Sequence, residues 1–328
     1  MDKVARLAPG ERSELFSQTA ANIGTTPAVV EKDFWVSWVL KRLYDDRALG
    51  KRLMFKGGTS LSKVYKLIQR FSEDIDLVLD WRQITDEDPF DSRSKTKQTK
   101  FNKEMMQRTE AYVRDTLFPE IKAMLSDVAT CMLDDDKHNC IHINYPAAFA
   151  DDYLRPSVFL EIGALSAWEP SETHQISCYA AEQFPTVFET TTCRVNVISA
   201  KRTFWDKATI LHNECWRPEN NPQNKGYSRH YYDLAKLAAS PIKDEALNDL
   251  DLLNNVGAFK QQFFPHGWSR YELAQPGSFR LIPPDHVVEA VRSDYASMQN
   301  MFFGAVPTMD NVLQQLADLE NEINQQKN

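Results

Sequence analysis

The stretch FKGGTSLSKVYKLIQRFSEDIDLVL, residues 55–79, decides the fold that we expect. It predicts a short strand, a Gly-Gly-Thr-Ser turn that opens a helix, and a second strand over Phe71–Leu79. Side chains alternate between the two faces of a strand, so Asp74 and Asp76 should point to the same side. Two carboxylates on one face repel each other unless a cation neutralises them. Oxygen ligands at this spacing suit Mg²⁺ or Mn²⁺.

The glycines of the turn predict a phosphate site. Gly57 and Gly58 let backbone N–H groups approach a ligand closely, and a helix N-terminus favours negative charge. We therefore expect a triphosphate to lie over Gly57, Gly58, Thr59 and Ser60. The two aspartates alone would fit a solvated strand face equally well. A phosphate cradle combined with metal-binding carboxylates is typical of nucleotide transfer.

Composition bounds the possible functions. At 328 residues the chain is long enough for two domains. It is 42% hydrophobic and 26% charged, which excludes a collagen-like or wholly disordered chain. The net charge of −8 argues against broad, sequence-independent binding of duplex nucleic acid. The five cysteines include no CxxC pair, so we expect reduced thiols. No apolar run approaches a membrane span and the N-terminus lacks the apolar core of a signal peptide, which predicts a cytoplasmic protein.

Hydrophobic spacing divides the chain into a mixed α/β domain, residues 1–199, and a mainly helical domain, residues 200–328. In the first domain the pattern predicts helices at 31–44, 61–68 and 101–126. The strands expected there are 53–55, 71–79, 131–145, 157–165 and 195–198. The polar stretch 81–100 is expected to be a loop. In the second domain the expected helices are 202–214, 229–239, 243–255, 285–301 and 309–325.

Several motifs together resemble one known family. GGTSLSK at 57–63, followed by RFSEDIDL at 70–77, is similar to motif I of the polymerase-β-type nucleotidyltransferase superfamily. The form is that of the AbiEii/AbiGii toxins, which include the MenT toxins. Four more segments also match: EKDFWV at 31–36, RTFWDKATILHNE at 202–214, RHYYDLAKL at 229–237 and SDYASMQNMFFG at 293–304. The resemblance implies a polymerase-β-like core, a mixed sheet flanked by helices, with a C-terminal helical domain.

The resemblance also implies roles for individual residues. Asp74 and Asp76 correspond to the metal-binding carboxylates, and Ser72 to the serine two residues before the first of them. Lys207 and Asp233 correspond to the lysine and aspartate of later motifs, which the C-terminal domain would contribute to the cleft. The implied activity is Mg²⁺-dependent transfer of a nucleotide from an NTP to RNA, with the tRNA 3′ end as the favoured acceptor. Such a protein would block translation as the toxin of a bacterial toxin–antitoxin or phage-defence pair, with a cognate antitoxin as a partner.

The chemistry of the C-terminal residues fits these roles. The ammonium of Lys207 could neutralise phosphate charge as pyrophosphate leaves. Arg202 is a second candidate for contact with phosphate. By spacing alone, Asp233 would be an ion-pair partner of Arg229, four residues earlier. The resemblance instead favours a position beside Lys207 or the nucleotide.

Glu161, in the apolar segment VFLEIGAL, is a candidate third carboxylate. Polymerase-β-like folds place such a group on a neighbouring strand, where it can bind metal or deprotonate the attacking hydroxyl. The alternative is a glutamate paired with a basic residue.

Two further patterns have weaker functional readings. His138, Cys140 and His142 alternate in HNCIH, but zinc sites need a fourth ligand and we expect only a polar strand edge. The stretch 91–114 is rich in Lys and Arg and could contact an RNA backbone, although charge runs are usually solvated faces.

Two alternative functions remain open from the sequence. One is a module that binds an NTP, for example GTP, and acts through a partner without transfer. The other uses the same metal site to modify a protein hydroxyl by nucleotide or phosphate transfer.

Overall fold

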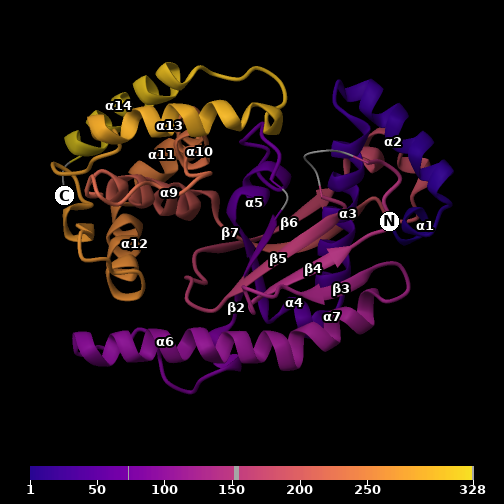
Figure 1. The fold of residues 1–328 in the computed structure, drawn as a ribbon, viewed down its shortest axis with the longest axis horizontal. Coiled ribbons are helices and arrows are strands. Elements are labelled where there is room, and N and C mark those ends of the chain that lie inside the picture. The colour runs from indigo at the N-terminus through magenta and orange to yellow at the C-terminus, as the bar shows by residue number, and fades with distance from the viewer. Residues whose placement is uncertain (73, 151–154, 327–328) are drawn as a thin grey trace. The chain divides into compact units, whose positions relative to one another are not determined.

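The computed structural model describes residues 1–72, 74–150 and 155–326, and within them seven strands form one mixed sheet (Figure 1). The strand order is β3-β4-β5-β2-β1-β7-β6. The strands are β1 Leu53–Lys56, β2 Asp74–Leu79, β3 Thr130–Leu133, β4 Cys140–Asn144, β5 Ser157–Gly163, β6 Ser171–Ser177 and β7 Thr192–Ile198. Strand β2 pairs antiparallel with β1 and parallel with β5, which places the two aspartates at the centre of the sheet. The α/β class with a mixed sheet is thereby confirmed.

The chain divides into two compact units. The first contains Met1–Val64 and Phe71–Ile198, and the second contains Tyr65–Arg70 and Ser199–Asn328. The segment Tyr65–Arg70 therefore belongs to the second unit, although it lies between a helix and a strand of the first in sequence.

Several helices of the first unit pack against its sheet. The helices of this unit are α1 Asp2–Ala5, α2 Pro9–Ile23, α3 Pro27–Asp45, α4 Arg47–Gly50, α5 Gly57–Lys63, α6 Lys95–Tyr112, α7 Phe118–Leu125 and α8 Tyr179–Gln183. Helix α3 begins where the Thr26 hydroxyl accepts a hydrogen bond from the backbone N–H of Val29, and it packs against β5 and β7. The charged residues of EKDFWV lie buried on this helix and bind other segments. Glu31 accepts from the backbone N–H of Ala148 at 2.8 Å, and Lys32 donates to the carbonyl of Arg155 at 2.9 Å.

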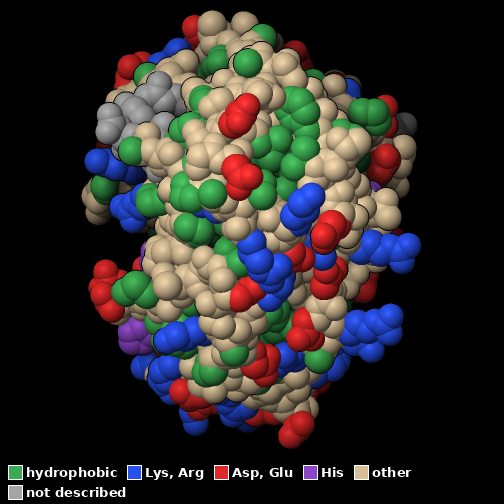
Figure 2. Space-filling view, turned by 90° about the vertical axis from the view of Figure 1, so that its right-hand side faces the viewer, with side chains coloured by type: hydrophobic (Ala, Val, Ile, Leu, Met, Phe, Trp, Pro, Cys, Tyr) green, Lys and Arg blue, Asp and Glu red, His purple; other side chains and the backbone are tan. Residues whose placement is uncertain are grey.

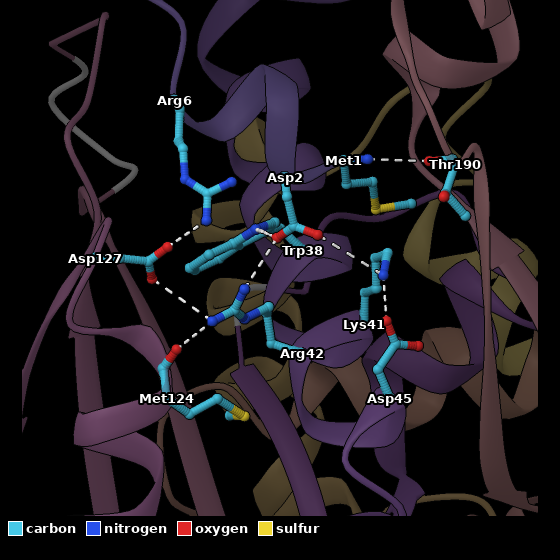
Figure 3. Close-up of polar contacts among 10 residues, drawn as sticks. All are labelled: Met1, Asp2, Arg6, Trp38, Lys41, Arg42, Asp45, Met124, Asp127 and Thr190. Atoms are coloured by element: carbon cyan, nitrogen blue, oxygen red, sulfur yellow. Dashed lines mark hydrogen bonds and ion pairs between the residues drawn. The ribbon is translucent and has the colours of Figure 1, made fainter.

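The first residues of the chain are also fixed to α3 (Figure 3). The Asp2 carboxylate accepts hydrogen bonds from the indole N–H of Trp38 at 2.9 Å and from Arg42 at 3.3 Å. The amino group of Met1 donates to the carbonyl of Thr190 at 3.0 Å. The two Asp2 contacts join α1 to α3, and the Met1 contact joins the N-terminus to the segment that precedes β7.

The second unit is helical. Its helices are α9 Ala200–Glu214, α10 Ser228–Ala238, α11 Ile242–Leu247, α12 Leu250–Phe263, α13 Asp285–Ser297 and α14 Met309–Gln325. The buried His212 of α9 fixes the loop that follows α12. Its Nδ1 accepts from the backbone N–H of Arg280 at 3.0 Å, so its Nε2–H can donate to the carbonyl of Arg270, also at 3.0 Å.

Four predicted elements are corrected by the structure. The helix predicted over 61–68 ends at Lys63, because the chain then leaves the helical conformation and Lys66 has a φ of 54°. The strand predicted over 131–145 is the hairpin β3–β4, because Asp134 accepts backbone hydrogen bonds that form a turn. The predicted loop 81–100 contains the first turns of α6. The helix predicted over 243–255 is divided into α11 and α12, where Asp249 caps the second helix.

Two strands also depart from the prediction. Strand β2 begins at Asp74 rather than Phe71, and Glu73 lies outside the described residues. The polar strand β6 was not predicted, because it is an edge strand with little apolar content. Its partner β7 supplies most of the buried side chains of the pair.

Charges of both signs are mixed on the surface that Figure 2 shows. Hydrophobic side chains on this face form several groups between Lys, Arg, Asp and Glu side chains. Among the residues described, no helix is both long and apolar enough to cross a bilayer.

Candidate active site

Asp74 and Asp76 lie on the same face of β2. Ile75 and Leu77 point the other way and are buried, whereas both aspartates are half-buried. In the sheet register Asp76 is opposite Lys56 of β1 on one side and Glu161 of β5 on the other. Register partners on neighbouring strands point to the same face. The face therefore carries a row of one ammonium and two carboxylates, with Asp74 one pleat away.

The glycine turn lies directly against the second aspartate. Gly57 has a φ of 84°, in the left-handed region that favours glycine. A Cβ built on Gly57 would lie 2.8 Å from Cγ of Asp76 and still closer to its carboxylate oxygen Oδ2. The backbone of the turn and the Asp76 carboxylate are thus in contact, which only a residue without a side chain permits.

The hydroxyl groups of the turn hold it to β2. Ser60 is buried and donates to the carbonyl of Gly57 at 2.8 Å. The Thr59 hydroxyl is bonded to the carbonyl of Asp74 and lies 3.3 Å from that of Ser72. These two side chains fix the shape of the turn, which leaves backbone N–H groups as the donors that it could offer to a phosphate.

Helix α5 is fixed at its other end. Lys63 forms a buried ion pair with Asp33 of α3, and Asp33 also accepts from the backbone N–H of Tyr179 at 2.7 Å. The glycine turn is therefore held at both ends, which is the rigidity that a binding site requires.

Replacing Gly57 by Ala should disable this site. The left-handed φ costs about 1 to 2 kcal/mol for an L-residue, and the new Cβ must displace the Asp76 carboxylate. We expect the nucleotide transfer that the motifs imply to fall by about a hundredfold or more, since the displaced carboxylate is one of the two cation ligands that the sequence predicts. Gly24→Ala is the matched control, because Gly24 has a φ of 70° and open space around its Cβ position. Equal activities of the two variants would contradict the contact between Gly57 and Asp76.

Glu161 is more exposed than its apolar neighbours in sequence suggested. Its side chain is 48% exposed, because β5 buries only one face, and it lies 3.9 Å from Lys137. Among the described residues, no three His, Cys, Asp or Glu side chains gather closely enough to hold a metal by themselves. Mg²⁺ commonly binds one or two carboxylates and completes its shell with water and substrate phosphates. Asp74 and Asp76 beside the turn fit that mode of binding.

The second unit contains a buried cluster of three charges. The Asp233 carboxylate of α10 is 0% exposed and bonds Arg70 through two contacts, from Nε to Oδ1 at 2.7 Å and from Nη2 to Oδ2 at 2.8 Å. Lys207 of α9 places its Nζ 2.7 Å from the same Oδ2. Burial alone would raise the pKa of Asp233, but the Arg70 and Lys207 charges lower it well below its usual range. Burial lowers the pKa of Lys207, and Asp233 opposes this shift.

A family comparison decides the class of this protein. The family model of the nucleotidyl transferase AbiEii toxin, a type IV toxin–antitoxin system, matches residues 38–317. The chain belongs to the AbiEii family. It is therefore a nucleotidyltransferase toxin, and the family implies an antitoxin as its partner. The resemblance inferred from the motifs is confirmed.

A solved structure agrees with this family in fold. MenT4, a nucleotidyltransferase toxin from Mycobacterium tuberculosis H37Rv, is similar with a TM-score of 0.50 at 14% sequence identity. The match covers 95% of this chain and 89% of that protein. No curated protein sequence matches.

The structure gives Asp233 of this AbiEii-family toxin a different partner from the one that its spacing indicated. Spacing alone indicated Arg229 at i−4, whereas the resemblance favoured a position beside Lys207 or the nucleotide. Arg229 is exposed, and Asp233 pairs with Arg70 and Lys207. Sequence analysis missed Arg70. Its position at the start of RFSEDIDL was the available signal, although nothing local identifies its partner.

His230 was also missed. In the part of the chain that the structure describes, its Nδ1 is buried without a hydrogen-bond partner. Burial, followed by the charges of Lys207 and Arg229, lowers the pKa of His230 well below its usual value. His230 lies three residues before Asp233 on α10, so both side chains share a helical face.

Arg202, the second predicted phosphate contact, is buried in the second unit. Its Nε lies 3.8 Å from Asp206, and its guanidinium lies over the ring of Phe259 at 5.7 Å. These contacts position it against α12.

The HNCIH segment has the polar character that was expected, but β4 lies between β3 and β5 rather than at the edge of the sheet. His142 pairs with Asp134 at 2.7 Å, and that hydrogen bond is the main reason why the pKa of Asp134 is lowered to about 2. His138 lies in the preceding turn, near the carbonyl of Asp135. The structure thus gives each histidine its own protein partner.

Helix α6 makes up most of the basic stretch 91–114. Exposed cations follow the helix: Lys95, Lys97, Lys100, Lys103 and Arg108. Arg93, just before it, is tied to its own loop by hydrogen bonds to the carbonyls of Asp88, Pro89 and Asp91.

Proposed function

We propose that this toxin transfers a nucleotide from an NTP to an RNA hydroxyl, the tRNA 3′ end being the favoured acceptor, and thereby blocks translation. The observation that carries the proposal is the contact between the glycine turn and Asp76. This contact supports the proposal, because backbone N–H groups that could bind a phosphate lie next to a carboxylate that suits a divalent cation. Family membership supplies the transfer activity itself.

Asp74 and Asp76 would hold Mg²⁺ or Mn²⁺, and water and substrate phosphates would complete the shell of the ion. Glu161, which the sequence offered as either a third ligand or a base, is proposed as the base. The bound cation neutralises phosphate charge and stabilises the departing pyrophosphate. The turn from Gly57 to Ser60 would bind the triphosphate through its backbone. Ser72 joins this group because its carbonyl lies near the Thr59 hydroxyl.

In the reaction the acceptor hydroxyl oxygen forms a bond to the α-phosphorus, and the bond between that phosphorus and the bridging oxygen to the β-phosphate breaks. Pyrophosphate leaves, and the hydroxyl proton passes to a base. Glu161 is the proposed base, because its partly exposed carboxylate shares a face with Asp76. Lys207 would bind phosphate charge, and Asp233, which contacts its ammonium, would position it. Arg202 is a further candidate for contact with the phosphates.

The experiment uses NTPs labelled at either the α- or the γ-phosphate, with Mg²⁺ and total tRNA. Nucleotidyl transfer places the α-label, and no γ-label, in RNA and releases one pyrophosphate per transfer. Label in protein would favour modification of a protein hydroxyl. Tight NTP binding without any transfer would favour a binding module, and either result would overturn the proposal.

Glu161→Gln tests the proposed base. We expect the rate of transfer to fall by about a hundredfold or more, since general-base catalysis contributes that much. Lys137→Met is the matched control, because it breaks the contact between Lys137 and Glu161 but leaves the carboxylate in place. If both variants keep the wild-type rate, Glu161 only forms a surface ion pair.

The proposal extends to the biology of the family. An acceptor RNA and an NTP are both cytoplasmic, so we propose that the toxin acts in the cytoplasm. Its role would be that of a toxin restrained by an antitoxin, with phage defence as one setting.

A further inference from the structure

The salt bridge between Arg70 and Asp233 fixes the carboxylate to which Lys207 binds. Arg70 engages both oxygens of Asp233, at 2.7 and 2.8 Å. Lys207 shares one of them, Oδ2, at 2.7 Å. The position of the carboxylate therefore depends on Arg70 through two contacts and on Lys207 through one.

Lys207 retains hydrogen-bonding capacity. Its ammonium has three N–H donors, and within the described residues Asp233 is its one hydrogen-bonding or ion-pairing partner. The side chain is nevertheless only 7% exposed. A buried ammonium is costly unless its donors meet acceptors, so the site favours an anionic ligand.

The segment that carries Arg70 is itself held by backbone contacts within the second unit. The N–H of Gln69 donates to the Tyr232 hydroxyl at 3.1 Å, and its carbonyl accepts from the N–H of Phe303 at 3.0 Å. Arg70 forms an isolated antiparallel bridge with Phe302. The guanidinium thus comes from a fixed backbone, as a group that orients another must.

We propose that Arg70 is the positioning residue of the phosphate-binding lysine. The inference rests on the role of Lys207 proposed above. Held by Arg70, Asp233 stays in place while Lys207 turns its remaining donors to a phosphate. Without Arg70, the Asp233 carboxylate is free to turn towards Lys207. The charges of Lys207 and Asp233 then cancel, so the pair attracts a triphosphate less strongly than the three-residue cluster, whose net charge is positive. Arg70→Lys would keep the positive charge but could not form both hydrogen bonds to the Asp233 carboxylate.

The experiment is a double-mutant cycle between Arg70 and Lys207. Wild type, Arg70→Gln, Lys207→Met and the double variant are compared by calorimetric NTP affinity and by KM and kcat of transfer. We expect each single variant to weaken NTP affinity by about 10- to 100-fold, the range seen when a residue that orients a ligand is removed. The double variant should be no weaker than Lys207→Met, because Arg70 acts through Lys207. Arg70→Lys should restore part of the affinity.

Arg217→Gln is the matched structural control. Arg217 forms a buried two-point pair with Glu214 at 2.6 and 2.8 Å, also in the second unit. The Arg217→Gln variant should have a lower melting temperature than wild type but the same NTP affinity. If Arg70→Gln does not fold, Arg70→Lys takes its place in the test, and we again expect weaker NTP affinity than in wild type.

Two results would overturn the inference in different ways. If the Arg70 variants bind the NTP as tightly as wild type, Arg70 is not a positioning residue. The same follows if the double variant loses as much NTP affinity as the two single losses multiplied together. In both cases the proposed role of Lys207 stands. Unchanged affinity in Lys207→Met would remove the role of Lys207, and the inference with it.

Discussion

Asp74→Asn and Asp76→Asn are each expected to lower the rate of nucleotide transfer by about a thousandfold, with little change in stability. Asparagine keeps the shape of aspartate but removes the charge that gathers a divalent cation. Both aspartates are half-buried, on the face of β2 opposite the buried Ile75 and Leu77, so we expect activity to suffer more than stability. The measurement is the initial rate of α-label transfer to tRNA, with thermal melting to confirm the fold.

Glu104→Gln is the control for these variants, because Glu104 lies on α6, where its contact is a 3.6 Å pair with Lys100. It should transfer at the wild-type rate. Wild-type transfer by either aspartate variant would show that the motif does not serve the reaction.

Asp233→Ala is expected to cause the largest loss of stability, about 3 to 5 kcal/mol, because it leaves the buried cations Arg70 and Lys207 without their shared carboxylate. Urea unfolding measures the change. Glu322→Gln is the matched control, because it removes the partly exposed ion pair with Lys243 in the same unit and should change the free energy of unfolding by less than about 1 kcal/mol. Similar losses in both variants would contradict a special role for the buried cluster.

The same carboxylate predicts a dependence of stability on pH. The pKa of Asp233 is lowered in the folded state, so the unfolded chain takes up the proton first as pH falls. The stabilisation is fully present above the ordinary aspartate pKa, about pH 4, and is lost progressively below it. The difference in unfolding free energy between wild type and Asp233→Asn should therefore narrow below pH 4. A difference that stays constant to lower pH would contradict the lowered pKa.

Features that depend only on neighbouring residues, such as the face on which Asp74 and Asp76 lie and the glycine turn, could be predicted from the sequence. The alternation of DIDL placed Asp74 and Asp76 on one face, since the period of a strand is two whatever surrounds it. The glycine turn was recognised because a left-handed φ and close backbone approach both require glycine at position 57. The predicted helix 61–68 was too long. The apolar residues Tyr65 and Ile68 continue its helical spacing, but their segment belongs to the second unit.

The long-range part of the candidate site could not be predicted. Arg70 and Asp233 are 163 residues apart, and no spacing rule links them. Spacing alone therefore pairs Asp233 with its helical neighbour Arg229, and only the resemblance favoured Lys207 or the nucleotide. The hydrogen bonds by which the Thr59 and Ser60 hydroxyls hold the turn to backbone carbonyls could not be read from the sequence either, because they depend on the three-dimensional shape of the turn and on β2.

Binding of Mn²⁺ in the presence of a non-hydrolysable NTP tests the central claim most directly, because it needs no knowledge of the acceptor. Electron paramagnetic resonance can count bound Mn²⁺ for wild type, Asp76→Asn and Gly57→Ala. The geometry predicts that wild type binds Mn²⁺ with the nucleotide and that both variants lose this binding. Equal Mn²⁺ affinity in all three proteins would contradict a cation site formed by the β2 carboxylates against the glycine turn.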